Sequence, residues 1–130
     1  MPVEVKVDRG RKLVLTSFYG EVTDADVTLQ ISELRRHAPF AEEFRVITDF
    51  SRVEQFNISS QMIRHVAQTE SPLASAKRVM VAPSDVAYGT SRMFQALASH
   101  TRPNLTVVRT LVEAYAALDL EGTSTQESIP

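Results

Sequence analysis

Hydrophobic and polar positions follow a strand-like period at the start of this chain. Val3, Val5 and Val7 alternate with charged residues, as expected of a strand with one buried face. Residues 9–11 predict a turn that offers a glycine for a positive φ, and Lys12–Tyr19 predicts a second strand. Because the connection is so short, we expect the two strands to form an antiparallel hairpin.

The first helical pattern follows this hairpin. Thr23 is placed to cap a helix whose buried stripe is Val27, Ile31 and Leu34, and Pro39 is expected to end that helix. Apolar residues three and four positions apart lie on one face of a helix, so this stripe is expected to pack on the sheet.

A second helix is predicted after the third strand. Phe44–Phe50 is the strand, with residues 52–57 as a connection. The helix begins at Ile58 or Ser59, and Asn57 is the expected N-cap. The residues expected to face inward are Met62, Ile63, Val66 and Ala67.

Residues 77–100 combine a short apolar run with a helical pattern, and the rest of the chain is arranged around them. Val79–Ala82 has little polar alternation, which is typical of a strand covered on both faces. Residues 83–85 stop this strand. The helix that follows is expected to place these residues on its buried face: Val86, Thr90, Met93, Phe94 and Leu97.

The last strand and helix come next. Leu105–Val108 predicts the fifth strand, and Thr110 and Glu113 have the spacing of a capping box. The apolar face of the final helix is expected to be Leu111, Ala114, Tyr115 and Leu118. Residues 121–130 are polar and aperiodic, so we interpret them as a disordered tail.

The order of elements is therefore ββαβαβαβα. Strands that alternate with helices predict an α/β fold with a mostly parallel five-stranded sheet and right-handed crossovers. The first strand is expected to be the antiparallel edge of that sheet. With 130 residues, the chain is expected to form a single domain over residues 1–120.

Composition removes several classes of function. The formal net charge is −2, with acids and bases interspersed, which is not the basic surface that nucleic-acid binding requires. The chain has no cysteine, which excludes disulfides, thiolate catalysis and cysteine-ligated metals. No signal peptide and no apolar segment of the length of a membrane span are visible, so we expect a cytoplasmic protein.

Three motifs, together with the order of the elements, resemble the SpoIIAA-like family, whose members are related to the STAS domains of anti-sigma factor antagonists. The resemblance covers roughly residues 3–120, and the motifs are Phe18-Tyr19-Gly20-Glu21-Val22-Thr23, Thr48-Asp49-Phe50-Ser51 and Ala82-Pro83-Ser84-Asp85-Val86-Ala87-Tyr88-Gly89 running into Ser91-Arg92-Met93-Phe94. It implies a compact sheet with helices wound as a βα superhelix. It also implies a protein partner, kinase-like or anti-sigma-like; a second copy of the chain is the other partner considered.

The resemblance also implies a phosphorylation site. In anti-sigma factor antagonists a serine at the start of the helix after the third strand is phosphorylated, in a motif close to Asp-Ser-Ser-Gly. Ser59 and Ser60 match the two serines here, whereas Asn57, Ile58 and Gln61 depart from the surrounding motif. A phosphate at this point would meet free N–H groups and the positive end of a helix. The alternative is that one serine caps the helix and the other is simply exposed.

Polar residues also gather where the predicted parallel strands end. Ligands of open α/β sheets bind outside the carboxyl ends of strands, and here those ends carry Asp49, Ser51, Pro83, Ser84, Arg109 and Thr110. Tyr88 and Arg92 are four residues apart on one helical face, a pairing found at binding hot spots. The alternative for both groups is ordinary caps, turns and an amphipathic rim.

The residues that carry metal and catalytic chemistry do not form a recognisable set. His37, His65 and His100 lack a second ligand at helical spacing, so no metal site is expected. No nucleophile elbow, phosphate loop or dinucleotide fingerprint is present. We therefore expect no enzymatic activity and no cofactor.

Two functions remain. The first is a non-enzymatic binding or regulatory module that acts through protein contacts at residues 57–64. The alternative is a binding protein for a small apolar or anionic molecule, with a cavity under the helices and the carboxyl ends of the strands. The residues expected to line that cavity are Phe50, Phe56, Met62, Met93 and Phe94.

Overall fold

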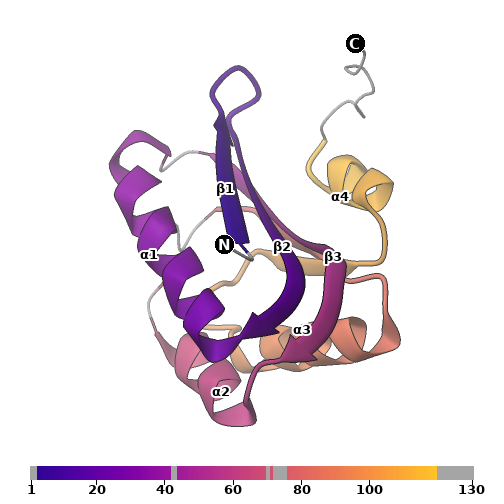
Figure 1. The fold of residues 1–130 in the computed structure, drawn as a ribbon. Helices are drawn as coiled ribbons and strands as arrows, with labels where there is room; N and C mark the ends of the chain where they lie inside the picture. The colour runs from indigo at the N-terminus through magenta and orange to yellow at the C-terminus, as the bar shows by residue number, and fades with distance from the viewer. Residues whose placement is uncertain (1–2, 42–43, 70, 72–75, 120–130) are drawn as a thin grey trace.

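Five strands and four helices form the fold in the predicted order (Figure 1). The structure is a computed structural model that describes residues 3–41, 44–69, 71 and 76–119. The predicted disordered tail, residues 121–130, lies outside the described residues. The elements are β1 (Val3–Asp8), β2 (Leu13–Thr23), α1 (Asp24–Ala41), β3 (Arg45–Asn57), α2 (Ser60–Gln68), β4 (Arg78–Val81), α3 (Asp85–Leu97), β5 (Leu105–Val108) and α4 (Leu111–Ala117).

The five strands form one mixed sheet in the order β1-β2-β3-β4-β5. β1 pairs with β2 antiparallel, and every later neighbouring pair is parallel. This confirms the predicted fold class and the antiparallel first strand. Each parallel pair is joined through a helix, because a parallel neighbour requires the chain to return to the same end of the sheet.

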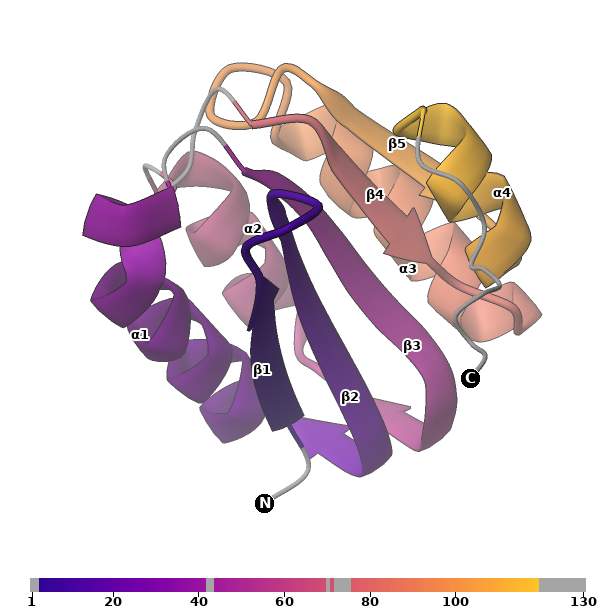
Figure 2. The same ribbon diagram turned by 90° about the horizontal axis from the view of Figure 1, so that it is seen from above.

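The helices cover the two faces of the sheet unequally. Helices α1, α2 and α3 lie on one face, and α4 lies alone on the other, over the β4 and β5 side (Figure 2). Strand residues alternate between the two layers, so Val46 faces the three-helix side while Ile47 packs with Leu118 of α4. Both strand residues are fully buried, which explains the continuous apolar run in the sequence.

Strands β2 and β3 are longer than predicted. Residues 52–57, expected to be a connection, continue β3, and they pair in parallel with the end of β2. Two register shifts interrupt this pairing, and Gly20 there has a φ of 67°. The extension was missed because its exposed face carries polar residues, while only Val53 and Phe56 are partly buried.

Helix α3 is rotated from the predicted orientation. Val86, Met93 and Leu97 were expected to face inward, but they are 65%, 40% and 43% exposed. The face on the sheet instead carries the buried residues Ala87, Ser91, Phe94 and Ala98. Small side chains at three of these four positions let the helix backbone approach the sheet closely, which a ranking by hydrophobicity does not reveal.

Two local expectations also proved wrong. Helix α1 continues to Ala41 and so runs past Pro39, where it was expected to end. In the β1–β2 turn the positive φ of 51° falls on Lys12, and Gly10 does not adopt one. The capping box of α4 is confirmed, because Thr110 and Glu113 each accept a hydrogen bond from the backbone of the other.

Candidate functional site

The N-terminus of α2 is tied to the N-terminus of α1 by one pair of side chains. The backbone N–H of Ser59 donates to Oδ1 of Asp24 at 2.8 Å, and its hydroxyl donates to Oδ2 of the same carboxylate at 2.8 Å. The Ser59 hydroxyl also accepts a hydrogen bond from the N–H of Met62 at 3.0 Å. Ser59 is therefore the N-cap of α2 and also joins two helices that are 35 residues apart in sequence.

The other residues predicted at this helix start have different surroundings. Asn57 was predicted to be the N-cap, and this prediction is wrong. Its amide instead donates to Oε2 of Glu21 at 2.7 Å across the extended β2–β3 pair. Ser60 is the first residue of α2, and its side chain is exposed. Ser59 takes the cap because its extended backbone, at φ −73° and ψ 152°, directs the hydroxyl back to the first helical turn.

A second group of side chains surrounds Arg109 at the carboxyl ends of β4 and β5. Its guanidinium donates to the carbonyl of Pro83 at 3.0 Å and to Oδ1 of Asp85 at 2.9 Å. It also lies 4.1 Å from the centre of the Tyr88 ring. Arg92 donates to the Tyr88 hydroxyl at 3.2 Å, so the expected Tyr88–Arg92 pair is present.

The remaining strand-end residues are engaged in local structure. Ser84 caps α3 by accepting from the N–H of Ala87 at 3.1 Å. Asp49 is buried, and its Oδ1 accepts from the N–H of Ser51 at 2.9 Å within the same strand. The structure therefore brings Ser84, Tyr88 and Arg92 to one corner, whereas the described contacts of Asp49 and Ser51 lie within β3.

A cavity of about 90 Å³ lies between the sheet and the helices α1, α2 and α3. Thirteen of its twenty lining residues are apolar, so most of its wall cannot bind a polar group. Four of the five residues expected to line a cavity do so, namely Phe50, Phe56, Met62 and Phe94. Met93 was the wrong member, because the rotation of α3 turns it outward.

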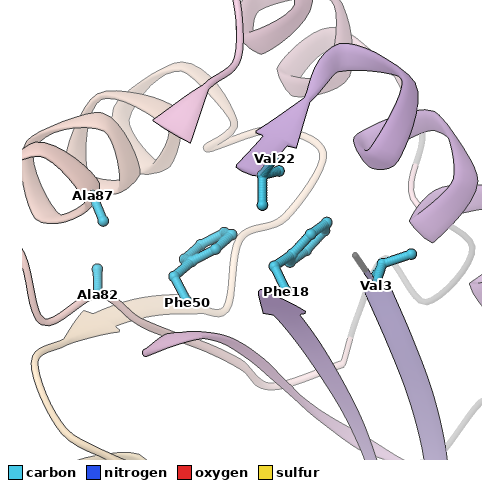
Figure 3. Packing of buried hydrophobic residues seen from close by; sticks show 6 residues of the cluster. All are labelled: Val3, Phe18, Val22, Phe50, Ala82 and Ala87. Atoms are coloured by element: carbon cyan, nitrogen blue, oxygen red, sulfur yellow. The ribbon is translucent and has the colours of Figure 1, made fainter. Parts of the chain in front are cut away.

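Aromatic rings form one end of this cavity. Phe18 and Phe50 stack with ring centres 5.3 Å apart, side by side beneath Val22 (Figure 3). Phe56 meets Phe50 edge to face, also at 5.3 Å. These rings come from the central and carboxyl parts of β2 and β3. Because aromatic rings are largely hydrophobic, this end of the cavity is apolar.

The opposite end of the cavity carries two buried arginines. Arg78 begins β4 and Arg102 precedes β5, and each side chain is 7% exposed. Arg102 donates through Nη1 to the carbonyls of Val66 at 3.0 Å and Thr69 at 3.2 Å. Arg78 donates through Nη2 to the hydroxyl of Ser71.

Burial changes the acid–base properties of both guanidinium groups. Removal from water lowers the pKa of Arg102 to about 10. Burial, and then the nearby charge of Arg102, lowers the pKa of Arg78 to about 10. Both groups still carry a proton at neutral pH, so this end of the cavity is positively charged.

The charged end of the cavity lies away from the site that the sequence argument considered. The sequence argument placed a ligand at the carboxyl ends of the strands, whereas the charged end of the cavity lies near the amino ends of β4 and β5. Sequence reasoning missed Arg78, Arg102 and Asp24. An arginine lies at the start of β4 and another lies three residues before β5, but nothing in the sequence indicated that these two would be buried together.

Two further features of the described residues bear on function. Within residues 3–41, 44–69, 71 and 76–119, no group of three or more histidine or acidic side chains is arranged to hold a metal ion. Over the same residues, none of the helices has both the length and the hydrophobicity needed to cross a membrane.

Comparison with known proteins supports the fold assignment. The chain has a SpoIIAA-like, STAS-like fold, because a solved structure superimposes over most of its length. That structure is the Bacillus cell fate determinant SpoIIAA in the phosphorylated form, with a TM-score of 0.56, 18% sequence identity, and coverage of 89% of this chain and 98% of SpoIIAA. By sequence, no family model matches, and no curated protein shows significant similarity.

Proposed function

We propose that this chain is a non-enzymatic regulatory module that binds a protein partner through the surface at the start of α2, residues 57–64. The observation that carries the proposal is the exposed Ser59 hydroxyl, which is held by the Asp24 carboxylate at 2.8 Å. This contact ties the N-termini of two helices together through one modifiable oxygen. A change at that oxygen therefore acts on the position of α2 as well as on local charge.

The fold likeness supports a phosphate at this position. The SpoIIAA structure with the same fold is of the phosphorylated form. In anti-sigma factor antagonists the modified serine lies at the start of the helix after the third strand, and Ser59 and Ser60 occupy the start of that helix here. A kinase-like partner would transfer the γ-phosphoryl group of ATP to Oγ of Ser59, releasing ADP and the hydroxyl proton.

Phosphorylation of Ser59 would replace attraction by repulsion at the Asp24 contact. The hydroxyl would lose the proton that it donates to Oδ2, and a group with about two negative charges would face the carboxylate. The free N–H groups at the start of α2 favour the phosphate, so the helix itself would tolerate it. The expected result is separation of the first turns of α1 and α2, which remodels the partner surface.

Ser60 provides a matched control for this mechanism. It is the next residue, it is also exposed, and no hydrogen bond of its side chain is seen in the described part of the chain. A phosphate on Ser60 would add the same charge without breaking the Asp24 contact. The two serines thus separate the effect of charge from the effect of the helix junction.

The partner surface would extend to the neighbouring helix α3. Tyr88 of α3 and Ile58, just before α2, both pack against the same buried cluster. The exposed pair of Tyr88 and Arg92 lies on this side, and tyrosine and arginine are frequent anchors of protein interfaces. We place both residues in the proposed surface.

The experiment is affinity enrichment from native cells with wild-type, Ser59→Glu and Ser60→Glu proteins, read by quantitative mass spectrometry. We expect a specific partner to bind the wild type and the Ser60→Glu variant, and to be depleted by about tenfold with Ser59→Glu. Intact mass of the protein from the same cells should show a phosphate adduct that maps to Ser59.

Three results would contradict the proposal. The first is that no captured protein depends on Ser59. The second is that Ser59→Glu and Ser60→Glu lose the partner equally. The third is that only further copies of this chain are captured. Equal loss would mean that charge alone, and not the Asp24 contact, controls binding.

A further inference from the structure

The cavity between the sheet and helices α1, α2 and α3 is too large to be a packing defect. Its volume is about 90 Å³. A single water needs roughly 10–15 Å³ of such space, and an apolar cavity of about 150 Å³ in another protein holds benzene. Protein interiors are otherwise close-packed, with few voids larger than a water molecule. The space therefore matches a small organic molecule of a few carbon atoms.

The walls of the cavity differ between its two ends. One end is formed by aromatic side chains of β2 and β3, namely Phe18, Phe50 and Phe56. The other end carries Arg78, Ser71 and Arg102, and the guanidinium carbon of Arg102 lies 5.2 Å from the centre of the Phe94 ring. A molecule that fits both ends must itself be apolar on one side and polar on the other.

The charge at the polar end defines which polar group would bind. Arg102 is buried, and in the described part of the chain no carboxylate lies within ion-pair distance of it. All three of its described hydrogen bonds leave from Nη1, to Val66, Thr69 and Thr101. Its Nε and Nη2 donors make no hydrogen bond among the described residues, and its side chain lines the cavity.

We propose that this cavity is a binding site for a small carboxylate with a short apolar tail, the carboxylate on Arg102 and the tail among the aromatic rings. A planar carboxylate matches the planar donor fork of a guanidinium, which makes the pair stronger than a neutral hydrogen bond. Because the remaining wall is mostly apolar, a singly charged head is favoured over a phosphate dianion, which demands more donors.

A carboxylate bound at Arg102 would also favour the charged form of the neighbouring arginine. Arg78 and Arg102 both line the cavity, and the charge of Arg102 contributes to the lowered pKa of Arg78. A bound anion between them reduces this repulsion and fills the adjoining space. The site is separate from the function proposed above, because neither Ser59 nor the Asp24 contact lines the cavity.

The test uses the unmodified full chain and two probes of matched size, sodium butanoate and butan-1-ol, in methyl and amide NMR titrations. Butanoate should give saturable shifts at Phe18, Phe50 and Arg102, with an affinity about tenfold higher than that of butan-1-ol. Acetate, which lacks the tail, should bind about tenfold more weakly than butanoate. Affinities of butanoate and acetate that are equal would overturn the apolar half of the proposal.

Variants of the chain locate the site. Arg102→Met should lower the affinity for butanoate by about tenfold and leave that for butan-1-ol unchanged, and Arg36→Met, on the exposed face of α1, should change neither. Met80→Phe introduces a bulkier ring into the cavity wall and should weaken the binding of both probes.

If Arg102→Met fails to fold, the probe pair and Met80→Phe still decide the question. No saturable shift for butanoate up to about 10 mM, or equal affinities for butanoate and butan-1-ol, would overturn the proposal. Because these titrations involve neither phosphate nor partner, their failure is distinguishable from failure of the proposed Ser59 switch.

Discussion

The two ends of the parallel strands both carry polar side chains but use them in opposite ways. At the carboxyl ends, Ser84, Thr110 and Asp49 each bind a backbone N–H two or three residues away. At the amino ends, Arg102 reaches across 36 residues to the carbonyl of Val66 and is buried there. Short-range caps bind backbone groups that would otherwise bind water. Burial of a guanidinium group costs free energy unless groups inside the protein pair with its charge.

This difference shows where a binding site is to be sought in this fold. Ser84 and Thr110 are exposed and Asp49 is buried, and all three are already engaged in local structure, so little of their hydrogen-bonding capacity is free for a ligand. The arginines at the amino ends adjoin a cavity and carry charge into the protein interior. Ligands of α/β sheets bind outside the carboxyl ends of the strands, and this rule points to the helix starts around Ser59 and Arg109. The cavity is a second candidate site of a different kind.

The largest expected effect tests the buried end. Arg102→Ala should destabilise the protein by about 3 kcal/mol, because the carbonyls of Val66 and Thr69 lose their donor and the Phe94 ring loses its packing partner. Urea unfolding measures the change. A loss below about 1 kcal/mol would mean that relief of the buried charge offsets the lost contacts, and that the arginine is not structurally required.

A smaller loss of stability is expected at Ser59. Its hydroxyl both caps α2 locally and binds Asp24, which is distant in the sequence. Ser59→Ala removes the cap of α2 and one of the two hydrogen bonds to Asp24, and should cost about 1.5 kcal/mol. Ser60→Ala, one residue later, should stay within about 0.5 kcal/mol of the wild type. Thermal unfolding of the two variants side by side makes the comparison, and equal losses would contradict the assigned cap.

Ser84 caps α3, but among the described residues its side chain makes no hydrogen bond like the one from Ser59 to Asp24. Ser84→Ala should cost about 1 kcal/mol, because the N–H of Ala87 loses its acceptor at the start of α3. Ser84→Asp should restore most of this stability, since aspartate is an equally good N-cap. A loss at Ser84 larger than that at Ser59 in urea unfolding would reverse the proposed order of local and long-range caps.

The smallest effect is expected at an exposed ion pair. The side-chain hydrogen bond from Arg11 is the first cause that lowers the pKa of Asp8. A carboxyl group whose pKa is lowered by folding stabilises the protein above its unfolded value of 3.8, and this contribution disappears as the pH falls through the folded value.

Asp8→Asn should therefore cost a few tenths of a kcal/mol at pH 7, because both side chains are partly exposed and screened by solvent. At pH 2 the variant and the wild type should be equally stable. Urea unfolding at the two pH values gives the comparison, and a difference that persists at pH 2 would exclude the charge as its cause.

The order and type of the elements were predictable because each has a local cause in the sequence. Val3, Val5 and Val7 specify an edge strand by alternation, and Thr110 and Glu113 specify a helix start by a spacing that brings their groups together. Predictions failed where neighbours in space override local preference. Residues 52–57 form a strand because β2 lies beside them, and α3 buries Ala87 and Ser91 because the sheet admits small side chains there.

The candidate sites show the same difference between local causes and contacts made only in the folded protein. The positions of Ser59 and Ser84 at helix starts follow from the chain itself, because a hydroxyl before a helix binds the N–H groups of its first turn within three residues. The meeting of Ser59 with Asp24, and of Arg78 with Arg102 at one cavity, was decided only by the tertiary structure. Such contacts join segments tens of residues apart, and their geometry depends on how the helices pack on the sheet, which no local spacing encodes.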